Sequence, residues 1–477
     1  MTFRLEMHFP KFPHPMMPTP AQTLPTSPLA TANVAIGKYR WTICGLVFFA
    51  TTINYLDRAV ISLLKPYLTT EFKWNSGDYA NIELAFKAAY ALGMMGVGRI
   101  IDRLGTKLGY ALSTFLWSLA AMGHALVSST MGFSVARAFL GVTEAGNFPA
   151  AIKTTAEWFP QRERALATGI FNSGSNVGAI VAPITVPLIA ETIGWKWAFI
   201  ITGALGFIWL ILWFAIYEVP ARTAKLTNAE FDYIHSDVDD MAAVAIETQP
   251  KITWSQLLKV RQTYAFIFGK FLTDPIWWFY LFWLPDFLTK QYGLKGTQIS
   301  LPVAIVYILS SIGSVGGGWI PLRFMKGGMP AFRARKIAML LIAFCVLPIV
   351  FVQYLGQINM WLAVLVIGIA AAAHQAWSAN IFSTASDMFP KRAVASVTGL
   401  GGMAGGLGGI LLTALVQKRM FVYYESIGQL NKAYFIMFLI CGGAYLSAWL
   451  LMQFFAPHMK MVRFDDVEKA SAATKLD

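Results

Sequence analysis

Three ionisable side chains fall inside long apolar stretches of this 477-residue chain. Asp57 and Arg58 are adjacent near the middle of the segment 41–66, and Glu144 lies in the segment 131–156. A charged group inside hydrocarbon costs roughly 3 kcal/mol or more, so such a residue is a functional hypothesis by default. A buried carboxylate near an arginine has two accessible charge states, one protonated and one ionised. We therefore predict that Asp57 and Glu144 exchange protons, and that Arg58 binds an anion.

Further charged residues occur at helical spacing. Arg137 precedes Glu144 by seven residues, about two turns, so the two share one helix face. Arg137 joins the predicted proton-coupling group, although a structural salt bridge is an equal alternative for it. Lys270 and Asp274 are four residues apart and are therefore helix neighbours. We predict that Lys270 contacts the anion, with snorkelling to the membrane surface as the competing interpretation.

A second cluster is aromatic and amide-rich. Aromatic faces can stack on a sugar ring, and amides can donate to hydroxyl groups. Packing and an interfacial aromatic belt are the alternative interpretation for some of these rings. The candidate contacts in this part of the chain are Trp277, Tyr280, His374, Gln375, Trp377 and Asn380. Glu83 and Lys87, also four apart but toward a helix end, are interpreted instead as a solvated pair.

Composition indicates lipid as the surrounding solvent. The chain is 56% hydrophobic and 13% charged, whereas soluble domains carry about 25% charged residues. The three cysteines all lie in apolar segments, which favours buried thiols over disulfides. Apolar windows long enough to cross a bilayer as helices recur along the chain. They predict spans at 41–66, 78–100, 108–128, 131–156, 165–189, 195–217, 263–289, 298–321, 335–355, 359–386, 394–416 and 430–455.

The basic residues behind the net charge of +13 are distributed as in a membrane protein rather than as in a nucleic-acid-binding protein. Eighteen Lys and Arg residues fall in the loops on one side of the predicted spans and eight on the other. This excess places both termini in the cytoplasm. The expected organisation is a disordered cytoplasmic tail at 1–40, a six-helix bundle at 41–217, a cytoplasmic linker at 218–262, a second six-helix bundle at 263–455 and a cytoplasmic tail at 456–477.

An internal repeat supports two related halves. Gly93, Gly96, Gly98, Ile100 and Arg103 recur 220 residues later as Gly313, Gly316, Gly318, Ile320 and Arg323. The pattern Phe-Pro-x-Arg-x-x-Ala-x-x-Thr-Gly at 159–169 recurs at 389–399. The chain is therefore predicted to be a parallel duplication, with its site at the interface between the repeats. Such a site would cycle by alternating access, coupling protons to an organic anion.

One loop carries a distinct motif. It contains Gly98, Asp102, Arg103, Gly105 and Lys107. Its glycines permit a tight turn and close helix approach, and its acid can pair with basic residues across an inner gate. The alternative is an ordinary positively charged loop. In the second copy of the repeat the acid is replaced by a leucine, at position 322.

These motifs and the duplication resemble the major facilitator superfamily, over residues 40–455. The patterns around Asn54-Tyr55-x-Asp57-Arg58, Arg137-x6-Glu144, Glu157-Trp-Phe-Pro and Lys270-Phe-x-x-Asp274-Pro resemble its anion:cation symporter family, and within it bacterial hexuronate (galacturonate or glucuronate) transporters. The resemblance implies twelve transmembrane helices in two pseudo-symmetric six-helix bundles, and proton-driven uptake of sugar acids. It implies proton handling by Asp57 and Glu144, carboxylate binding by Arg58, and sugar contacts from Tyr55 and Tyr90.

One departure and several alternatives remain. Where aldonate members carry an asparagine-bearing pattern, the segment 399–406 is nearly all glycine and apolar, which leaves the distal hydroxyls of the substrate to other helices. An exchanger of organic phosphates or another small carboxylate, and a non-transporting nutrient sensor, are the alternatives. We expect no enzyme activity, cofactor or metal. The expected partners are a small organic anion, protons and membrane lipid, and the expected form is a monomer in a bacterial inner membrane.

Overall fold

The computed structural model describes residues 36–74, 76–236, 252–294, 298, 300–462 and 464. The predicted N-terminal tail lies almost wholly outside these residues, as does part of the linker. Helices make up the described secondary structure. In the first half they are α1 (Tyr39–Phe72), α2 (Ser76–Leu104), α3 (Thr106–Gly123), α4 (Thr130–Glu144), α5 (Asn147–Trp158), α6 (Gln161–Ile193) and α7 (Trp195–Ile216).

Two short linker helices lead into the second half. They are α8 (Asn228–Ile234) and α10 (Trp254–Leu258). The remaining helices are α11 (Arg261–Tyr292), α12 (Ser300–Lys326), α13 (Ala331–Val346), α14 (Val352–Ile358), α15 (Met360–Met388), α16 (Val394–Leu411), α17 (Lys418–Ser426) and α18 (Leu430–Phe455), and a π-helical turn (Leu412–Gln417) joins α16 to α17.

Each predicted span falls on a single helix or on consecutive helical segments. Nine of the described helical runs are long and apolar enough to cross a membrane. The other three predicted spans fall on α3, on α4 with α5, and on α11. The all-α membrane fold is therefore confirmed. The bounds of the two bundles stay predictions.

One predicted helix, 131–156, is interrupted beside its carboxylate. Helix α4 ends at Glu144 and α5 begins at Asn147. Pro149 has no N–H to donate to the carbonyl four residues earlier, which weakens the helix at this point. The Thr143 carbonyl accepts a hydrogen bond from Ser113 of α3, at 2.5 Å. The interruption leaves Glu144 as the last residue of α4.

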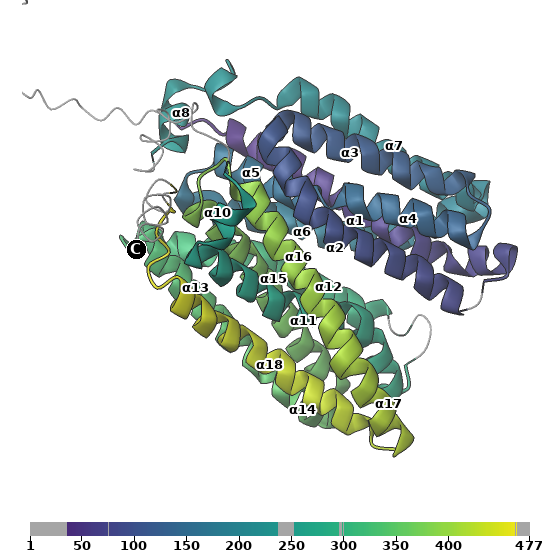
Figure 1. Cartoon of the computed structure of the whole chain (residues 1–477). Helices are drawn as coiled ribbons and strands as arrows, with labels where there is room; N and C mark the ends of the chain where they lie inside the picture. Colours follow the sequence, from purple (N-terminus) through teal and green to yellow (C-terminus); the bar gives the residue numbers. More distant parts are fainter. Residues whose placement is uncertain are drawn as a thin grey trace, which may run out of the picture. The chain divides into compact units, whose positions relative to one another are not determined.

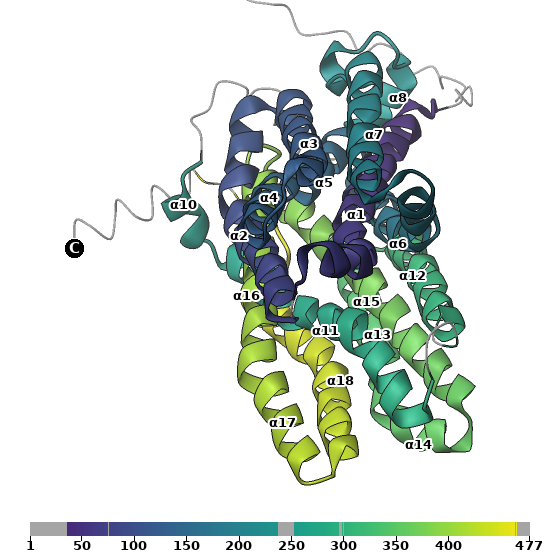
Figure 2. The same cartoon turned by 90° about the vertical axis from the view of Figure 1, so that its right-hand side faces the viewer.

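The two halves meet along two helix pairs. Helix α6 packs against α12, and α2 packs against α16; Figures 1 and 2 show both pairs side by side. A Cβ on Gly98 would lie 2.3 Å from the carbonyl oxygen of Ala395, and one on Gly318 would lie 2.2 Å from that of Ala165. These contacts are equivalent under the repeat.

A second pair of contacts follows the same symmetry. A Cβ on Gly169 would meet the carbonyl oxygen of Ser314, and one on Gly399 would meet that of Met94, each at 2.2 Å. Only glycine permits such close backbone approach between helices. Four glycines of the sequence repeat are therefore points at which the duplicated halves touch.

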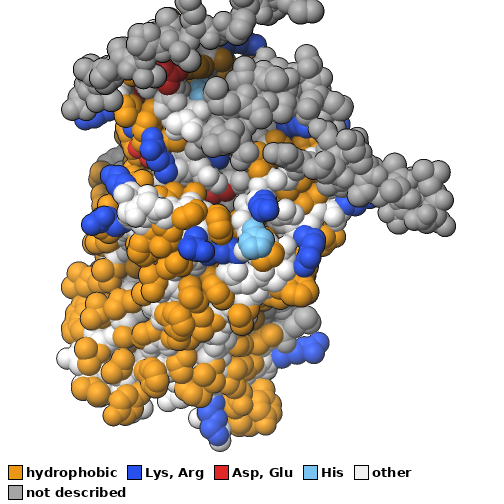
Figure 3. All heavy atoms as spheres, turned by 90° about the vertical axis from the view of Figure 1, so that its left-hand side faces the viewer, with side chains coloured by type: hydrophobic (Ala, Val, Ile, Leu, Met, Phe, Trp, Pro, Cys, Tyr) orange, Lys and Arg blue, Asp and Glu red, His pale blue; other side chains and the backbone are white. Residues whose placement is uncertain are grey.

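Helix α1 begins and α18 ends at the same end of the helical bundle (Figure 1). We call this the linker end. Figure 3 shows Lys and Arg side chains gathered near one end of a face that hydrophobic side chains otherwise cover. Exposed Leu, Ile and Phe side chains occur on most of the long helices, as expected for a surface in lipid. Cys44 and Cys441 are buried as predicted, whereas Cys345 is exposed.

Candidate functional site

Arg58 of α1 and Glu144 of α4 form an ion pair. The guanidinium Nε donates to the carboxylate at 2.6 Å. Glu144 is fully buried, while 20% of the Arg58 side chain is exposed. The guanidinium also lies over the rings of Tyr90, at 4.4 Å, and Tyr55, at 4.8 Å, from the ring centroids. The cation is thus held by a carboxylate and two aromatic faces, with part of its surface accessible to an anion.

Asp57 points to a different side of α1. It is 2% exposed and lies beside Thr202 of α7. Neither of its carboxylate oxygens makes a hydrogen bond of normal geometry to a described residue. Asn54, one turn earlier, is also buried, and its side-chain amide finds no such partner among the described residues. Of the two carboxylates predicted to carry protons, Glu144 is therefore paired with an arginine, whereas Asp57 has no such partner among the described residues.

Arg137 does not pair with Glu144, despite sharing its helix. It donates to Glu83 of α2 at 3.0 Å and lies over the ring of Phe86, at 4.5 Å from the ring centroid. The Glu83–Lys87 distance is longer, at 4.0 Å. The predicted Glu83–Lys87 pair is present, with side chains 20% and 36% exposed, but Glu83 has a nearer partner, Arg137, from another helix. Spacing within one helix could not reveal this.

The second half carries its own ion pair, on α11. Lys270 and Asp274 lie 2.8 Å apart, with side chains 5% and 21% exposed. The Lys270 ammonium lies over the ring of Phe382 from α15, at 3.9 Å from the ring centroid. Lys270 is thus enclosed between Asp274 and Phe382. The more accessible member of this pair is the carboxylate.

His374, Trp277 and Tyr445 form a polar and aromatic cluster on α15, α11 and α18. The His374 and Trp277 rings stack with centroids 5.0 Å apart. The Nδ1 atom of His374 and the hydroxyl of Tyr445 are hydrogen-bonded at 2.6 Å. This geometry fixes the plane of the imidazole ring. The predicted sugar contacts Trp277 and His374 therefore lie together.

An aromatic bridge joins the two ion pairs across the interface between the halves. Phe148 of α5 stacks on Phe382 of α15, with centroids 5.2 Å apart. The same Phe148 contacts the ring of Tyr55, at 6.4 Å. Rings consequently connect Arg58, at one end, to Lys270, at the other. Neither phenylalanine was predicted, because no sequence signal distinguishes them from packing residues.

Three further residues of the second half that were predicted to contact the substrate are buried within the protein. Gln375 accepts a hydrogen bond from Asn172 of α6 at 2.7 Å, across the two halves. Asn380 donates to the carbonyl oxygens of Gly317 and Ala376. Trp377 is fully buried. Gln375 thus takes part in a hydrogen bond between the halves.

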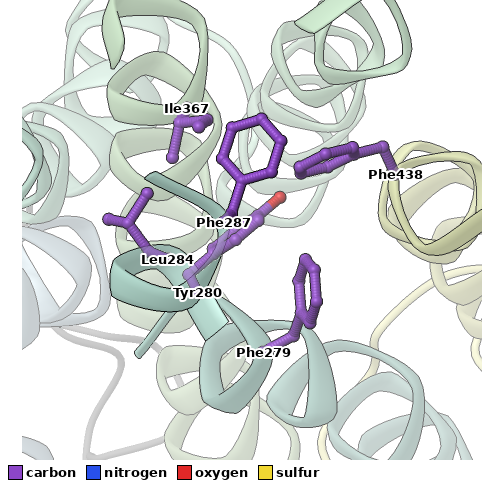
Figure 4. A pocket seen from close by; sticks show the side chains of 6 residues that line it. All are labelled: Phe279, Tyr280, Leu284, Phe287, Ile367 and Phe438. Atoms are coloured by element: carbon purple, nitrogen blue, oxygen red, sulfur yellow. The ribbon is translucent and has the colours of Figure 1, made fainter. Parts of the chain in front are cut away.

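Tyr280 lies apart from the ion pairs. It lines a small apolar pocket, into which Figure 4 shows its ring and hydroxyl pointing. The lining residues come from α11, α15 and α18 and are Phe279, Tyr280, Leu284, Phe287, Ile367 and Phe438. Among the side chains that the structure describes, none that lines this pocket is charged, so the pocket is unsuited to an anion.

At the linker end, the loop motif connects the halves. Asp102 accepts hydrogen bonds from the backbone N–H and the hydroxyl of Ser396, at 2.7 and 2.6 Å. Ser396 belongs to the first turn of α16, where the helix dipole favours a negative charge. The base that pairs with Asp102 is Lys153 of α5, at 2.9 Å. Lys153 lies outside the loop motif, whose own basic residues are the partners that the sequence suggests for Asp102.

The other residues of the motif shape this end. Gly98 touches the backbone of α16, as described above. Gly105 has φ +81° between α2 and α3, a conformation that glycine adopts without strain. Lys107 pairs with Glu218, just after α7, at 2.7 Å. Arg103 is exposed.

A second cross-half contact lies nearby. Arg164 of α6 donates to the carbonyl oxygen of Ser386 at 2.8 Å and lies 3.7 Å from Asp387. Arg335 of α13 donates to Asp387 at 2.6 Å. The linker end is therefore fastened by charged groups from both halves, in addition to the glycine contacts.

Comparison with known proteins adds to this geometry. Residues 47–413 match the profile of the Major Facilitator Superfamily. The chain is 33% identical over 378 residues to the "Hexuronate transporter" of Escherichia coli (strain K12), covering 79% of this chain and 87% of that protein. It is 35% identical over 287 residues to the "Galacturonate transporter" of Dickeya chrysanthemi, covering 60% of this chain and 83% of that protein.

A solved structure shares the fold. The proton:xylose symporter XylE bound to 6-bromo-6-deoxy-D-glucose superposes with a TM-score of 0.69 at 16% identity, covering 91% of this chain and 99% of that one. The predicted resemblance to hexuronate transporters is confirmed by the two relatives.

Proposed function

The chain belongs to the major facilitator superfamily, and on that premise we propose that it is a proton-coupled symporter that imports a sugar acid, most specifically a hexuronate such as galacturonate or glucuronate. The single observation that carries this proposal is the Arg58–Glu144 pair. Its carboxylate is fully buried and its cation is partly exposed. An arginine in this position suits the planar carboxylate of an organic anion.

The coupling follows from charge balance in a site of low dielectric. With Glu144 ionised, its carboxylate occupies Arg58, and the pair is neutral. A proton on Glu144 removes that negative charge, so Arg58 becomes available to the carboxylate of the substrate. Proton and anion therefore enter together, and an ionised Glu144 without substrate restores the original pair. Asp57 is the second proposed proton site. It is buried, and the negative charge of Glu144 acts on it.

Alternating access provides the path. The two halves touch through the glycine contacts and the Asp102–Ser396 bonds at the linker end. We assign this end to the cytoplasm of a bacterial inner membrane, with both termini inside, because of the charge bias in the loops. The described conformation is then closed toward the cytoplasm. The proton gradient drives the cycle, and a monomer surrounded by lipid contains all the proposed parts.

The phosphate-exchange alternative has less support from the geometry. A phosphate dianion calls for two available cations, and Lys270 is neutralised by Asp274 and enclosed by Phe382. That leaves Arg58 as the accessible cation of the two. A single carboxylate is the better match.

Transport in proteoliposomes tests the proposal. Purified protein is reconstituted, and uptake of labelled galacturonate, glucuronate, galactonate and glycerol phosphate is measured with and without an imposed inward proton gradient. We expect accumulation of a hexuronate above its outside concentration only with the gradient. Gradient-independent exchange of glycerol phosphate, with no hexuronate uptake, would overturn the proposal.

A further inference from the structure

The two ion pairs at the interface between the halves differ in which partner is the more exposed: the basic side chain in one pair and the acidic side chain in the other. In the Arg58–Glu144 pair the arginine side chain is 20% exposed and the glutamate side chain 0%. In the Lys270–Asp274 pair the lysine side chain is 5% exposed and the aspartate side chain 21%. The first half therefore presents a hydrogen-bond donor with positive charge. The second half presents an acceptor.

Asp274 is held firmly in that role. Lys270, one helical turn earlier, pairs with it at 2.8 Å and balances its charge. On the other side lies α16, where a Cβ on Gly405 would come within 2.1 Å of the Asp274 carboxylate. The carboxylate is thus seated against bare backbone of α16. Lys270 itself is covered by the Phe382 ring, so any ligand reaches the carboxylate before it reaches the ammonium.

The two presented groups are connected by side chains that contact one another. The Tyr55 ring lies 4.8 Å from the Arg58 guanidinium and packs on Phe148, with ring centroids 6.4 Å apart. Phe148 in turn stacks on Phe382, the ring that covers Lys270 beside Asp274. A substrate that spans this line of rings would meet Arg58 at one end and Asp274 at the other.

We propose that Asp274 is a specificity-determining residue that accepts hydrogen bonds from the distal hydroxyl groups of the substrate whose carboxylate Arg58 binds. This inference rests on the proposed function and deepens it. Carboxylate oxygens are strong acceptors with no proton to donate when ionised. They match vicinal hydroxyls, which are donors, and they repel a second carboxylate.

The consequence is a defined substrate class. The chain selects sugar acids that carry one carboxylate and hydroxyl groups at the opposite end. Sugar dicarboxylates, with a charged group at both ends, are excluded by Asp274. This assignment also fills the gap left by the glycine-rich segment 399–406, which offers almost no polar side chain: its glycines make room for the residue of α11 that reads the hydroxyls.

Binding measurements on the purified full-length protein test the assignment. Affinities are measured by titration calorimetry for galacturonate, for galactarate (its dicarboxylate analogue) and for tetrahydropyran-2-carboxylate, which keeps the ring and carboxylate but has no hydroxyl groups. For the unaltered protein we expect galacturonate to bind at least about tenfold more tightly than either of the others, as the loss or repulsion of a charged hydrogen-bond partner implies.

The variant Asp274→Asn keeps the size of the side chain and removes its charge. We expect it to weaken galacturonate by roughly tenfold while it tightens galactarate, so that the preference shrinks or reverses. Binding of tetrahydropyran-2-carboxylate should change little. Asp232→Asn, an exposed linker position, is the matched control and should leave all three affinities as they are.

The outcomes separate the two proposals. If the unaltered protein binds galactarate as tightly as galacturonate, Asp274 does not select, and the inference is overturned while sugar-acid transport stands. An unchanged affinity ratio in Asp274→Asn has the same meaning. If the protein binds none of the three acids but binds glycerol phosphate, the proposed function itself is wrong, and the inference falls with it. Should the variant not fold, the comparison of ligands on the unaltered protein still decides.

Discussion

Arg58 reaches across from α1 to meet Glu144 at the last residue of α4, at 2.6 Å, although Arg137 stands on the same helix as Glu144. Arg137 is occupied by Glu83 of α2. The first half therefore distributes two arginines over two carboxylates from different helices. This division leaves Arg58 alone to respond to the protonation of Glu144.

Replacing Glu144 with Gln mimics a permanently protonated carboxyl. We expect Glu144→Gln to bind substrate and to exchange it across the membrane, but to lose accumulation driven by a proton gradient, because the neutral amide cannot release a proton. Counterflow and gradient-driven uptake in proteoliposomes measure the two activities separately. The control is Glu191→Gln. Glu191 lies near the C-terminal end of α6, and among the described residues its hydrogen-bond partner is Tyr67. Retained accumulation in Glu144→Gln would contradict the coupling mechanism.

The guanidinium of Arg58 contributes shape as well as charge. Arg58→Lys keeps the charge but loses the planar fork and its stacking between Tyr55 and Tyr90. We expect substrate affinity to fall by ~10- to 100-fold, the effect of losing a charged hydrogen bond. Titration calorimetry measures it. The exposed Arg222 of the linker provides the control variant Arg222→Lys, which should bind normally; equal affinity in Arg58→Lys would argue against direct contact with the carboxylate.

Gly405 is predicted to be intolerant of a side chain. A methyl group there would overlap the Asp274 carboxylate and its Cβ, forcing α11 and α16 apart. We expect Gly405→Ala to destabilise the protein by roughly 1–3 kcal/mol, the usual effect of overpacking, seen as a lower midpoint of thermal unfolding in detergent. Gly316→Ala on α12, with open space around its Cβ, should unfold at the same temperature or slightly higher. Similar midpoints for the two variants would show that the close approach is not needed.

The closure of the linker end depends in part on Asp102. In Asp102→Asn the ion pair with Lys153 and the interaction with the α16 dipole are both weakened, the latter by about 0.3–1 kcal/mol. We expect faster hydrogen exchange at the backbone N–H of Ser396, measured by mass spectrometry over residues 394–397. Asp78→Asn, in the first turn of α2 at the opposite end, serves for comparison. Unchanged exchange in Asp102→Asn would mean that the glycine contacts alone keep this end closed.

A pH dependence is expected at the Glu218–Lys107 pair, outside the membrane. The hydrogen bond from Lys107 lowers the pKa of Glu218 from its ordinary value of 4.5. The stabilisation is therefore complete above pH 4.5 and is lost as the pH falls through the lowered pKa. Because both side chains are about one-third exposed, its size is at most about 1 kcal/mol.

Thermal unfolding of Glu218→Gln at two pH values measures this contribution. We expect a slightly lower midpoint than that of the unaltered protein at pH 7, and a smaller difference at pH 3. High salt should reduce the difference at pH 7. A difference that is as large at pH 3 as at pH 7 would indicate that packing, rather than charge, is responsible.

The helices could be predicted because hydropathy acts locally. Windows of apolar residues placed each predicted span on described helices, nine of which are long and apolar enough to cross a membrane, and the repeated glycines indicated a duplication. The interruption between Glu144 and Asn147 was missed, although Pro149 offered a signal. Its effect depends on Ser113 of α3 taking the Thr143 carbonyl, which is a tertiary contact.

The ionisable residues of the site were found by the same reasoning, since charge in an apolar window is conspicuous. Their pairing was not found. Spacing within a helix correctly brought Lys270 to Asp274, but it could not decide between Arg58 and Arg137 as the partner of Glu144. Asp274 is more exposed than Lys270 because the ring of Phe382 covers Lys270. In the sequence, Phe382 cannot be told from an ordinary packing residue.

The glycine contacts between the halves have a mechanical consequence. At Gly98, Gly169, Gly318 and Gly399 the opposing surface is backbone carbonyl, so no side chain interlocks with another at these points. Two smooth backbones can part without any rotamer change. Opening this end must then break the charged bonds that fasten it, so we expect the turnover rate to change when those bonds are altered and the four glycine contacts are left as they are.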